Sequence, residues 1–498
     1  MAEYPRRDNL TGDAPGCEHQ GKPTPPMREK LELLRSCCYL VARWILVWDG
    51  NCEVCLNPYR CVPLTTLKTM PQPKTQGESS MNEDGNTRGT RRYVALDIHK
   101  HYCVVAGVDR EGRVVLQAVR VEHTELEGWL KKNLLATDHV VLESTTNAWH
   151  VYDLLEPLAE RVVVANPIKV KQIAQARVKT DIRDTLILAR LLAANLVPDV
   201  WVPPAHVREM RQLLSQRRQL VETHTQIVNR MHSVAHRHHL KHERGKRFNE
   251  KNTLWQKDKH LSKVEQFQLE LEMENRGYIE KQISRIGKEV AKMSHKNPWA
   301  QDMTYLMQLP GFGVITGMTV LAAIGEIQRF ETAKRLASYS GLTGGLDQSG
   351  THLVQKGITK EGRKELRWAL VEAAQRTVKS DPRWTRRFQE LQKRLHRNQA
   401  IVAIARQLLE LVWYVLTRRQ PYRPFSQERI AYKYLTWAWQ MDDEARDGLT
   451  RQQFTWYYLM RLGIGHDLTR IALDPKHPRR IASEAELLAL RPELNHIE

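Results

Sequence analysis

Four acidic residues stand at positions where carboxylates could do chemistry rather than serve the fold. Asp97 lies inside the apolar stretch YVALDI, and Glu143 ends a second apolar stretch, VVLE. An Asp is unfavourable within a β-strand and costs free energy if it is buried without a partner. Asp181 and Asp184 are three residues apart, so on a helix they face the same side. We therefore treat these four residues as candidates for one acidic site.

Such a quartet would be suited to phosphoryl transfer. Two divalent cations about 4 Å apart can activate a nucleophile and stabilise the leaving oxygen, and Mg²⁺ (or Mn²⁺) prefers an all-oxygen shell. Each residue alone has a simpler interpretation, because a strand-end Asp is commonly a turn or cap residue and Asp181 could cap a helix. The order favours the site: an acid in the first strand, one in the fourth strand, then the helical pair.

The elements that must position these carboxylates are predicted over residues 91–204. Valine-rich alternation predicts three strands from Arg91 to about Val121, and ELEGWLKKNL, HVVLES, WHVYDLLEPLA and RVVVANP follow as helix, strand, helix and strand. This is the order of an α/β RNase H-like, RuvC-like sheet, which would place all four acids at one end. The segment from Val170 to Leu196 is predicted to be helical.

The rest of the chain is predicted to be mostly helical. In residues 205–298, Leu213, Leu220, Ile227 and Val234 step by seven, which is typical of a long helical coiled-coil segment. Residues 299–420 form a third, mostly α unit, interrupted by a long Gly- and Thr-rich loop from Gly341 to Gly362. Residues 421–498 read as a helical, aromatic-rich tail.

Composition indicates a polyanionic partner. The chain has 76 Lys and Arg against 57 Asp and Glu, a formal charge of +19, and neutralised phosphates release counterions. We expect nucleic acid and no membrane, since no run of eighteen apolar residues occurs.

Few, irregularly spaced cysteines suit a reducing cytoplasm. Residues 1–90 read as a disordered extension, with Met81 a natural start; Cys52, Cys55 and Cys61 make at most half a zinc site.

The sequence resembles a known family at these same motifs. YVALDIHK, VVLESTTN, VVVANPIKVK and KTDIRDTLILARLL are similar to the DEDD transposase domain of bacterial insertion sequence family 110, which includes the Piv invertases. The resemblance implies a RuvC-like catalytic domain whose metal-binding quartet is Asp97, Glu143, Asp181 and Asp184. The run from Lys179 to Asp184 is the most specific part.

The third unit resembles the C-terminal transposase domain of the same family, from about Met307 to Ala374. The resemblance implies a serine nucleophile in a Ser-Gly pair, and Ser349 occupies that position. Gly344 stands where many relatives have Pro, which puts the local turn in doubt. A serine attacks a phosphodiester only when it is deprotonated and the phosphate charge is neutralised. We expect nearby cations to bind phosphates: Lys356, Lys360, Arg363 and Lys364.

The resemblance also implies partners. Family members are guided by a structured bridge RNA that pairs with target and donor DNA, and their catalytic unit is assembled between protomers. We therefore expect a homo-oligomer, dimer or tetramer, associated with the nucleoid in the bacterial cytoplasm. Basic residues of the heptad segment would contact nucleic-acid backbones, or simply form its solvated face: Arg217, Arg218, Arg230, Arg237 and Lys241.

Three functions are thus compared. The first is RNA-guided transposition through a covalent serine–DNA intermediate. The second is a RuvC-like structure-specific nuclease or resolvase, in which metal-activated water replaces the serine. The third is a non-catalytic nucleic-acid-binding derivative, against which the intact quartet argues.

Overall fold

The computed structural model describes residues 91–174, 180–239, 260–422, 424, 426–466, 468, 470–471, 479–480, 485–486 and 489. The predictions for residues 1–90, with their cysteines, and those for Lys179 and Lys241 lie outside this part of the chain.

A five-stranded mixed sheet organises the first part. Its strands are β1 (Tyr93–Ile98), β2 (Tyr102–Val108), β3 (Val114–Glu122), β4 (His139–Glu143) and β5 (Arg161–Ala165), in the order β3-β2-β1-β4-β5. β1, β2 and β3 pair antiparallel, while β4 and β5 run parallel to β1. The sheet and its sequence of elements match the predicted order, and the mixed α/β sheet is consistent with an RNase H-like fold.

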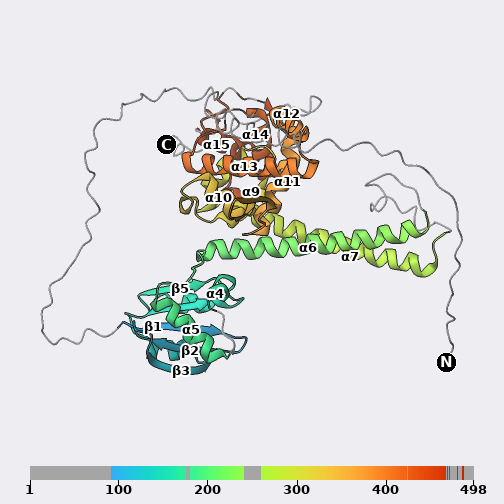
Figure 1. Ribbon diagram of the computed structural model, residues 1–498. Coiled ribbons are helices and arrows are strands. Elements are labelled where there is room, and N and C mark those ends of the chain that lie inside the picture. Colours follow the sequence, from blue (N-terminus) through green and yellow to red (C-terminus); the bar gives the residue numbers. More distant parts are fainter. Residues whose placement is uncertain are drawn as a thin grey trace, which may run out of the picture. The chain divides into compact units, whose positions relative to one another are not determined.

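Alternation along the strands divides the core into two apolar layers. Val94, Leu96 and Leu142 pack on the side of α2 (Leu126–Asn133) and α3 (Ala148–Leu155). Ala95, Val141 and Val163 face the other way and pack against α4 (Pro167–Ile173) and α5 (Asp181–Ala193). Figure 1 shows α5 lying along the sheet. The predicted single helical segment is therefore two helices, because Ala174 and Thr180 are extended.

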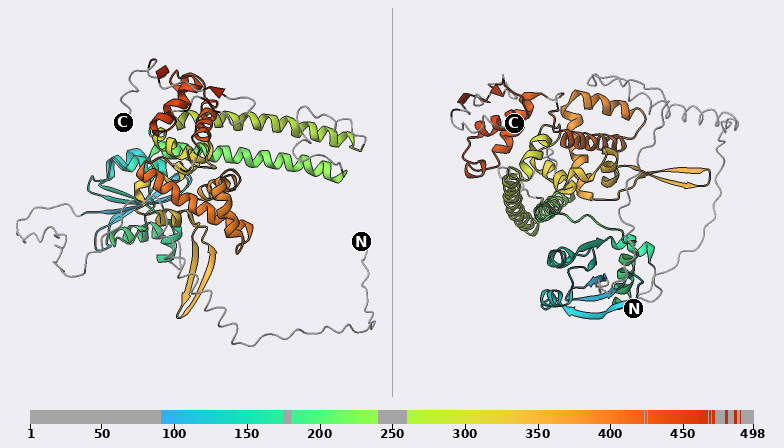
Figure 2. Two further views of the ribbon diagram at one scale, coloured as in Figure 1. Left: turned by 90° about the horizontal axis from the view of Figure 1, so that it is seen from above. Right: turned by 90° about the vertical axis from the view of Figure 1, so that its left-hand side faces the viewer.

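Two long helices follow, in the region where the heptad pattern predicted a long helical segment. α6 (Ala205–Arg237) and α7 (Lys263–Ser294) run side by side in both views of Figure 2. Ile227, Met231 and Val234 of α6 bury their side chains with Leu269 of α7. The apolar seam is thus filled, over these residues, by the second helix of the same chain.

A helical region follows α7, and one apolar core unites it. It contains α8 (Trp299–Met307), α9 (Val314–Ile324), α10 (Ala333–Ser340), α11 (Lys364–Ser380), α12 (Pro382–Gln392), α13 (Arg397–Arg418), α14 (Gln427–Ala438) and α15 (Arg451–Arg461), with short 3-10 turns at Ile327–Arg329 and Glu444–Arg446 and a small pair, β8 (Arg470–Ile471) and β9 (Arg479–Arg480). The core continues from both long helices into the aromatic-rich tail.

The aromatic tail packs into this core. Four aromatic side chains are fully buried and pack together in tilted and edge-to-face arrangements, with ring centroids 4.7 to 6.3 Å apart: Tyr434, Trp437, Phe454 and Tyr458. α13 is long and apolar enough to cross a membrane by length and composition alone. Nine of its side chains are buried in the same core, which accounts for its hydropathy.

The predicted long loop after α10 is wrong in part, because two strands form within it. β6 (Gly344–Ser349) and β7 (His352–Ile358) make an antiparallel hairpin that projects from the surrounding helices in Figure 2. The turn has two residues, and Gly350 adopts a positive φ of 57°. Two-residue turns of this kind match the right-handed twist of paired strands. The Ser-Gly turn did not predict a hairpin because the glycines on either side have low strand propensity.

Candidate active site

The sheet directs two carboxylates toward α5. Leu96 of β1 pairs with Leu142 of β4, so the next residues, Asp97 and Glu143, are neighbours at the carboxyl ends of parallel strands. Because side chains alternate, Asp97 shares its face with Ala95, which packs against α5. Glu143 shares the same face through Val141. The strand pattern and register therefore bring both acids to one end of the sheet, on one face.

The start of α5 supplies the other two carboxylates. The Thr180 hydroxyl accepts a hydrogen bond from the Arg183 amide (3.3 Å) and caps the helix, so Asp181 and Asp184 occupy its first turn. The positive end of the helix dipole favours carboxylates there. The Thr185 hydroxyl donates to the Asp181 carbonyl (2.6 Å) and ties this turn to the next. Helix capping and the acidic pair thus belong to one local motif.

The four acids converge, but not symmetrically. Asp97, Glu143 and Asp184 line one cavity together with Pro167, Val170 and Lys171 of α4. Asp181 lies beside Asp97 instead. One ligand atom each from Asp97, His99 and Asp181 lies within 4.8 Å of the other two. All of these acids are partly buried.

His99 bridges two of the carboxylates. Its Nε2 lies 3.2 Å from Asp97 Oδ2 and 3.3 Å from Asp181 Oδ2. Tyr102 stacks on the imidazole with ring centroids 4.6 Å apart, and its hydroxyl donates to Asp181 Oδ2 (3.1 Å). Asn147 and His123 hold the backbone carbonyl of His99. The histidine therefore occupies a defined position in the acidic site.

His99 and Tyr102 were missed from the sequence. Their signal was the alternation in DIHKHY, where His99 follows Asp97 by two residues and can share its side of the strand. Tyr102 begins β2, just across the turn in which the His99 amide donates to the Tyr102 carbonyl (2.9 Å). Its contact with Asp181 depends on how β2 and α5 pack.

Electrostatics distinguish Asp97 from an ordinary surface acid. Burial raises the pKa of Asp97, and the neighbouring carboxylates of Asp181 and Asp184 raise it further, against the opposing effect of His99. The Tyr102 pKa is raised as well, chiefly by its hydrogen bond to Asp181. The raised pKa of Asp97 shows that its carboxylate has too little positive charge around it. The donor set and its charge fit a divalent cation.

Ser349 lies at the tip of the β6–β7 hairpin. It pairs with His352 across the two-residue turn, and both side chains are exposed and line a shallow hollow with Asp347. Lys356 on β7 forms an ion pair with Asp347. Another serine of this region, Ser340 at the end of α10, is buried and donates to the Ala337 carbonyl (2.7 Å), so it packs inside the fold.

The other predicted phosphate-binding residues fall into two groups. Lys360 follows β7, Arg363 immediately precedes α11, and Lys364 begins that helix. Arg217 and Arg218 face this region from α6. Arg230 and Arg237 lie further along α6 and pair with acids of α7, Arg230 Nη2 at 2.9 Å from Glu272 and Arg237 at 3.4 Å from Glu265. These two are therefore partly neutralised within the helix pair.

Comparison with known proteins places both regions among transposases. Residues 94–240 match a family model for the DEDD domain of IS110 elements, described as "Transposase", and residues 303–389 match the model of the "Transposase IS116/IS110/IS902 family". The first match contains the acidic site, and the second contains Ser349 and α11.

Whole relatives give the same result. The transposase for insertion sequence element IS1111A of Coxiella burnetii is 24% identical over 67% of this chain and 91% of its own length. The pilin gene-inverting protein of Moraxella bovis is 27% identical over 60% of this chain and 86% of its own length. One of these is named for transposition and the other for gene inversion, so both names describe DNA rearrangement.

Proposed function

Since the chain belongs to the insertion sequence 110 family of transposases, we propose that it cuts and rejoins DNA with metal-bound carboxylates and a serine nucleophile, guided by a bridge RNA. The observation that carries this proposal is the convergence of Asp97, Glu143 and Asp184 on one cavity, with Asp181 beside Asp97. Burial and the neighbouring carboxylates raise the pKa of Asp97, and a bound cation would offset both effects.

The four acids would hold one or two divalent cations, Mg²⁺ or Mn²⁺, which supply positive charge to the phosphate and the leaving oxygen. His99 and Tyr102 orient Asp97 and Asp181 in this scheme. Lys171, on the cavity wall, offers a cation to the DNA backbone. The charge surplus of +19 supplies the wider electrostatic attraction to DNA and RNA.

Ser349 would act as the nucleophile. Its Oγ attacks a phosphodiester phosphorus, the serine proton passes to a base, and the bond to the leaving DNA oxygen breaks to give a serine–DNA ester. His352, its pairing partner in the hairpin, is a candidate proton acceptor. A hydroxyl end of another strand then attacks the ester, joins the new strand and restores the serine. Because both bonds are phosphodiesters, no external energy source is needed.

The exposed hairpin suits a composite site, in which the serine of one protomer meets the acids of another. Dimer or tetramer formation in the bacterial cytoplasm, close to the nucleoid, belongs to the same proposal. The basic residues that would position nucleic acid are Arg217, Arg218, Arg230, Arg237, Lys241, Lys356, Lys360, Arg363 and Lys364.

A recombination assay in cells tests the proposal. The element's ends and flanking noncoding DNA are supplied on one plasmid, a target on a second, and junctions are counted by sequencing. Ser349→Ala and Asp97→Asn should each reduce junctions by at least about 10³-fold, whereas Ser338→Ala, an exposed serine on α10, should retain them. Undiminished junctions with Ser349→Ala would contradict the serine mechanism and favour the water-using nuclease.

The guide is tested separately by sequencing the RNA that copurifies with the protein at high salt. A single RNA from the element's flank is expected, with loops that match target and donor. Only heterogeneous RNA would contradict guidance while leaving the serine chemistry intact.

A further inference from the structure

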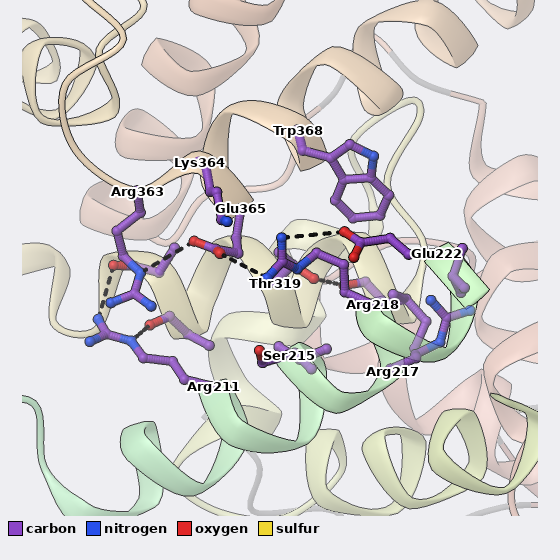
Figure 3. Close-up of a pocket in the computed structure, with 15 residues that line it drawn as sticks. Arg211, Ser215, Arg217, Arg218, Glu222, Thr319, Arg363, Lys364, Glu365 and Trp368 are labelled. Carbon is purple, nitrogen blue, oxygen red and sulfur yellow. Dashed lines mark hydrogen bonds and ion pairs between the residues drawn. The ribbon is translucent and has the colours of Figure 1, made fainter. Parts of the chain in front are cut away.

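A second cavity lies away from the acids, between α6, α9 and the first turn of α11. Its volume is about 310 Å³, at the small end of the range for small-molecule sites. Figure 3 shows side chains from α6 and from the start of α11 facing one another across it. The wall contributed by α9 and by part of α6 is largely apolar: Leu214, Val221, Ile315, Ala322 and Ala323.

The cavity holds more positive charge than its acids can neutralise. Five cations line it, namely Arg211, Arg217, Arg218, Arg363 and Lys364, against two acids, Glu222 and Glu365. The ion pairs are long: Arg218 lies 3.5 Å from Glu222 and 3.9 Å from Glu365, and Arg363 lies 3.9 Å from Glu365. At these distances the guanidinium groups keep donors available for an anion.

Burial makes this excess of positive charge in the cavity less favourable. The Nε atoms of Arg217 and Arg218 are buried without a hydrogen-bond partner. Burial lowers the pKa of Arg211 to about 10, with further contributions from the positive charges of Arg363 and Arg329. Arg211 itself is held by the Ala322 and Ala323 carbonyls at 2.6 and 3.2 Å. A bound anion would offset the repulsion between these groups.

Two further features indicate a nucleotide. α11 begins in the cavity with no side-chain cap at Arg363, so its first amides can bind a phosphate. Trp368, one turn further along, is 46% exposed and offers an aromatic surface at the rim. Arginine forks suit phosphate oxygens, and an exposed tryptophan suits stacking with a base.

We propose that this cavity binds one unpaired nucleotide of a bound nucleic-acid strand, with its phosphate at Arg218, Arg363 and the start of α11 and its base on Trp368. The inference takes nucleic acid as the partner from the proposed function, and adds a base-capture site that is separate from the reacting carboxylates. Stacking tolerates any base, so the site would register strand position rather than sequence.

Cross-linking and affinity measurements on the full-length protein test the site. Single-stranded RNA and DNA oligonucleotides of one sequence carry a photoreactive thio-base at successive positions, and the cross-linked peptide is identified by mass spectrometry. One position should cross-link to the α11 peptide containing Trp368. Trp368→Leu should weaken binding of that oligonucleotide about 5- to 150-fold, the range of a lost base stack, while Trp368→Phe should retain most of the affinity.

Matched controls separate the outcomes. Trp439→Ala removes a tryptophan of similar exposure, 52%, from outside the cavity and should leave affinity unchanged. An abasic residue at the cross-linked position should abolish the difference between wild type and Trp368→Leu. Equal affinity of both proteins for the intact oligonucleotide would overturn the proposal, as would adenosine monophosphate occupying the cavity while no oligonucleotide label reaches it. If the wild-type protein cross-links to the oligonucleotide through the Trp368 peptide but gives no recombination junctions, the proposed function is contradicted and the base-binding site is not.

Discussion

Neutralising Asp97 should stabilise the metal-free protein and abolish its stabilisation by metal. Its carboxylate lies within 4.8 Å of an Asp181 oxygen. At an effective dielectric of about 20, two such charges repel by about 3.5 kcal/mol. Because the Asp181 side chain is 48% exposed, solvent screening reduces this to about 1 kcal/mol. Asp97→Asn removes that repulsion.

The pH dependence has a defined sign. The pKa of Asp97 is raised in the folded state, so the folded protein binds the proton more tightly than the unfolded chain. Stability should therefore fall as pH rises from the unfolded value, near 4, through the raised folded value. In chelator, the wild type should lose local stability across this window, and Asp97→Asn should lose less.

Bound metal should make the wild type more stable than Asp97→Asn, the reverse of their order in chelator. At one hundred times its dissociation constant, a cation that binds only the folded state stabilises it by about 2.7 kcal/mol, equivalent to 100-fold slower exchange through that opening. The wild type should gain this protection from Mg²⁺ or Mn²⁺, and Asp97→Asn should gain little.

Hydrogen–deuterium exchange of peptides covering β1, β4 and α5 measures these effects locally in the whole chain. In chelator at pH 8, Asp97→Asn should exchange about fivefold more slowly than wild type, which corresponds to about 1 kcal/mol. Glu156→Gln, at an exposed acid after α3, is the control and should behave as wild type. Equal metal protection of wild type and Asp97→Asn, or faster exchange of Asp97→Asn in chelator, would refute the reasoning.

Two predictions concern the helical region. Gly311→Ala should lower the free energy of urea unfolding by about 3 kcal/mol or more, because φ is +79° and a Cβ would lie 2.2 Å from the Ala373 carbonyl oxygen. Gly313→Ala is the control: a Cβ there meets open space, so it should cost under about 1 kcal/mol. Equal losses in the two variants would contradict the prediction. His295 Nε2 donates to the Asp447 carboxylate (3.0 Å), its Nδ1 accepts from the Tyr458 hydroxyl (2.5 Å), and burial lowers its pKa. Stability should therefore fall as pH drops below about 6.5, and His295→Gln should flatten the melting temperature between pH 8 and 5; an unchanged slope would exclude this histidine as the cause.

The element order and the placement of the four acids near one end of the sheet could be predicted because they depend on local patterns. Alternation in YVALDI fixes the face of Asp97, and the cap at Thr180 fixes the first turn of α5. The sequence patterns predicted each strand of the sheet. Local physics sufficed where the residues that matter lie on one strand or one helical turn.

Contacts between distant elements could not be predicted in this way. Tyr102 reaches Asp181 only because β2 packs under α5, and Glu272 neutralises Arg230 only because α7 returns along α6. The aromatic tail shows the same limit, since Trp437 donates to a carbonyl of α7 and Tyr434 donates to a carbonyl of α8. The sequence identifies such aromatic residues, but their contact partners depend on how distant elements pack in the folded structure.

The most direct test of the proposed chemistry is a trapped protein–DNA adduct. A donor DNA nicked beside the cleavage site loses its leaving strand, so a serine ester cannot be reversed and accumulates. Peptide mass spectrometry should place the DNA on Ser349, in a reaction that needs divalent metal and fails with Asp97→Asn. Strand cleavage that proceeds without any covalent adduct, or an adduct on another residue, would contradict the account.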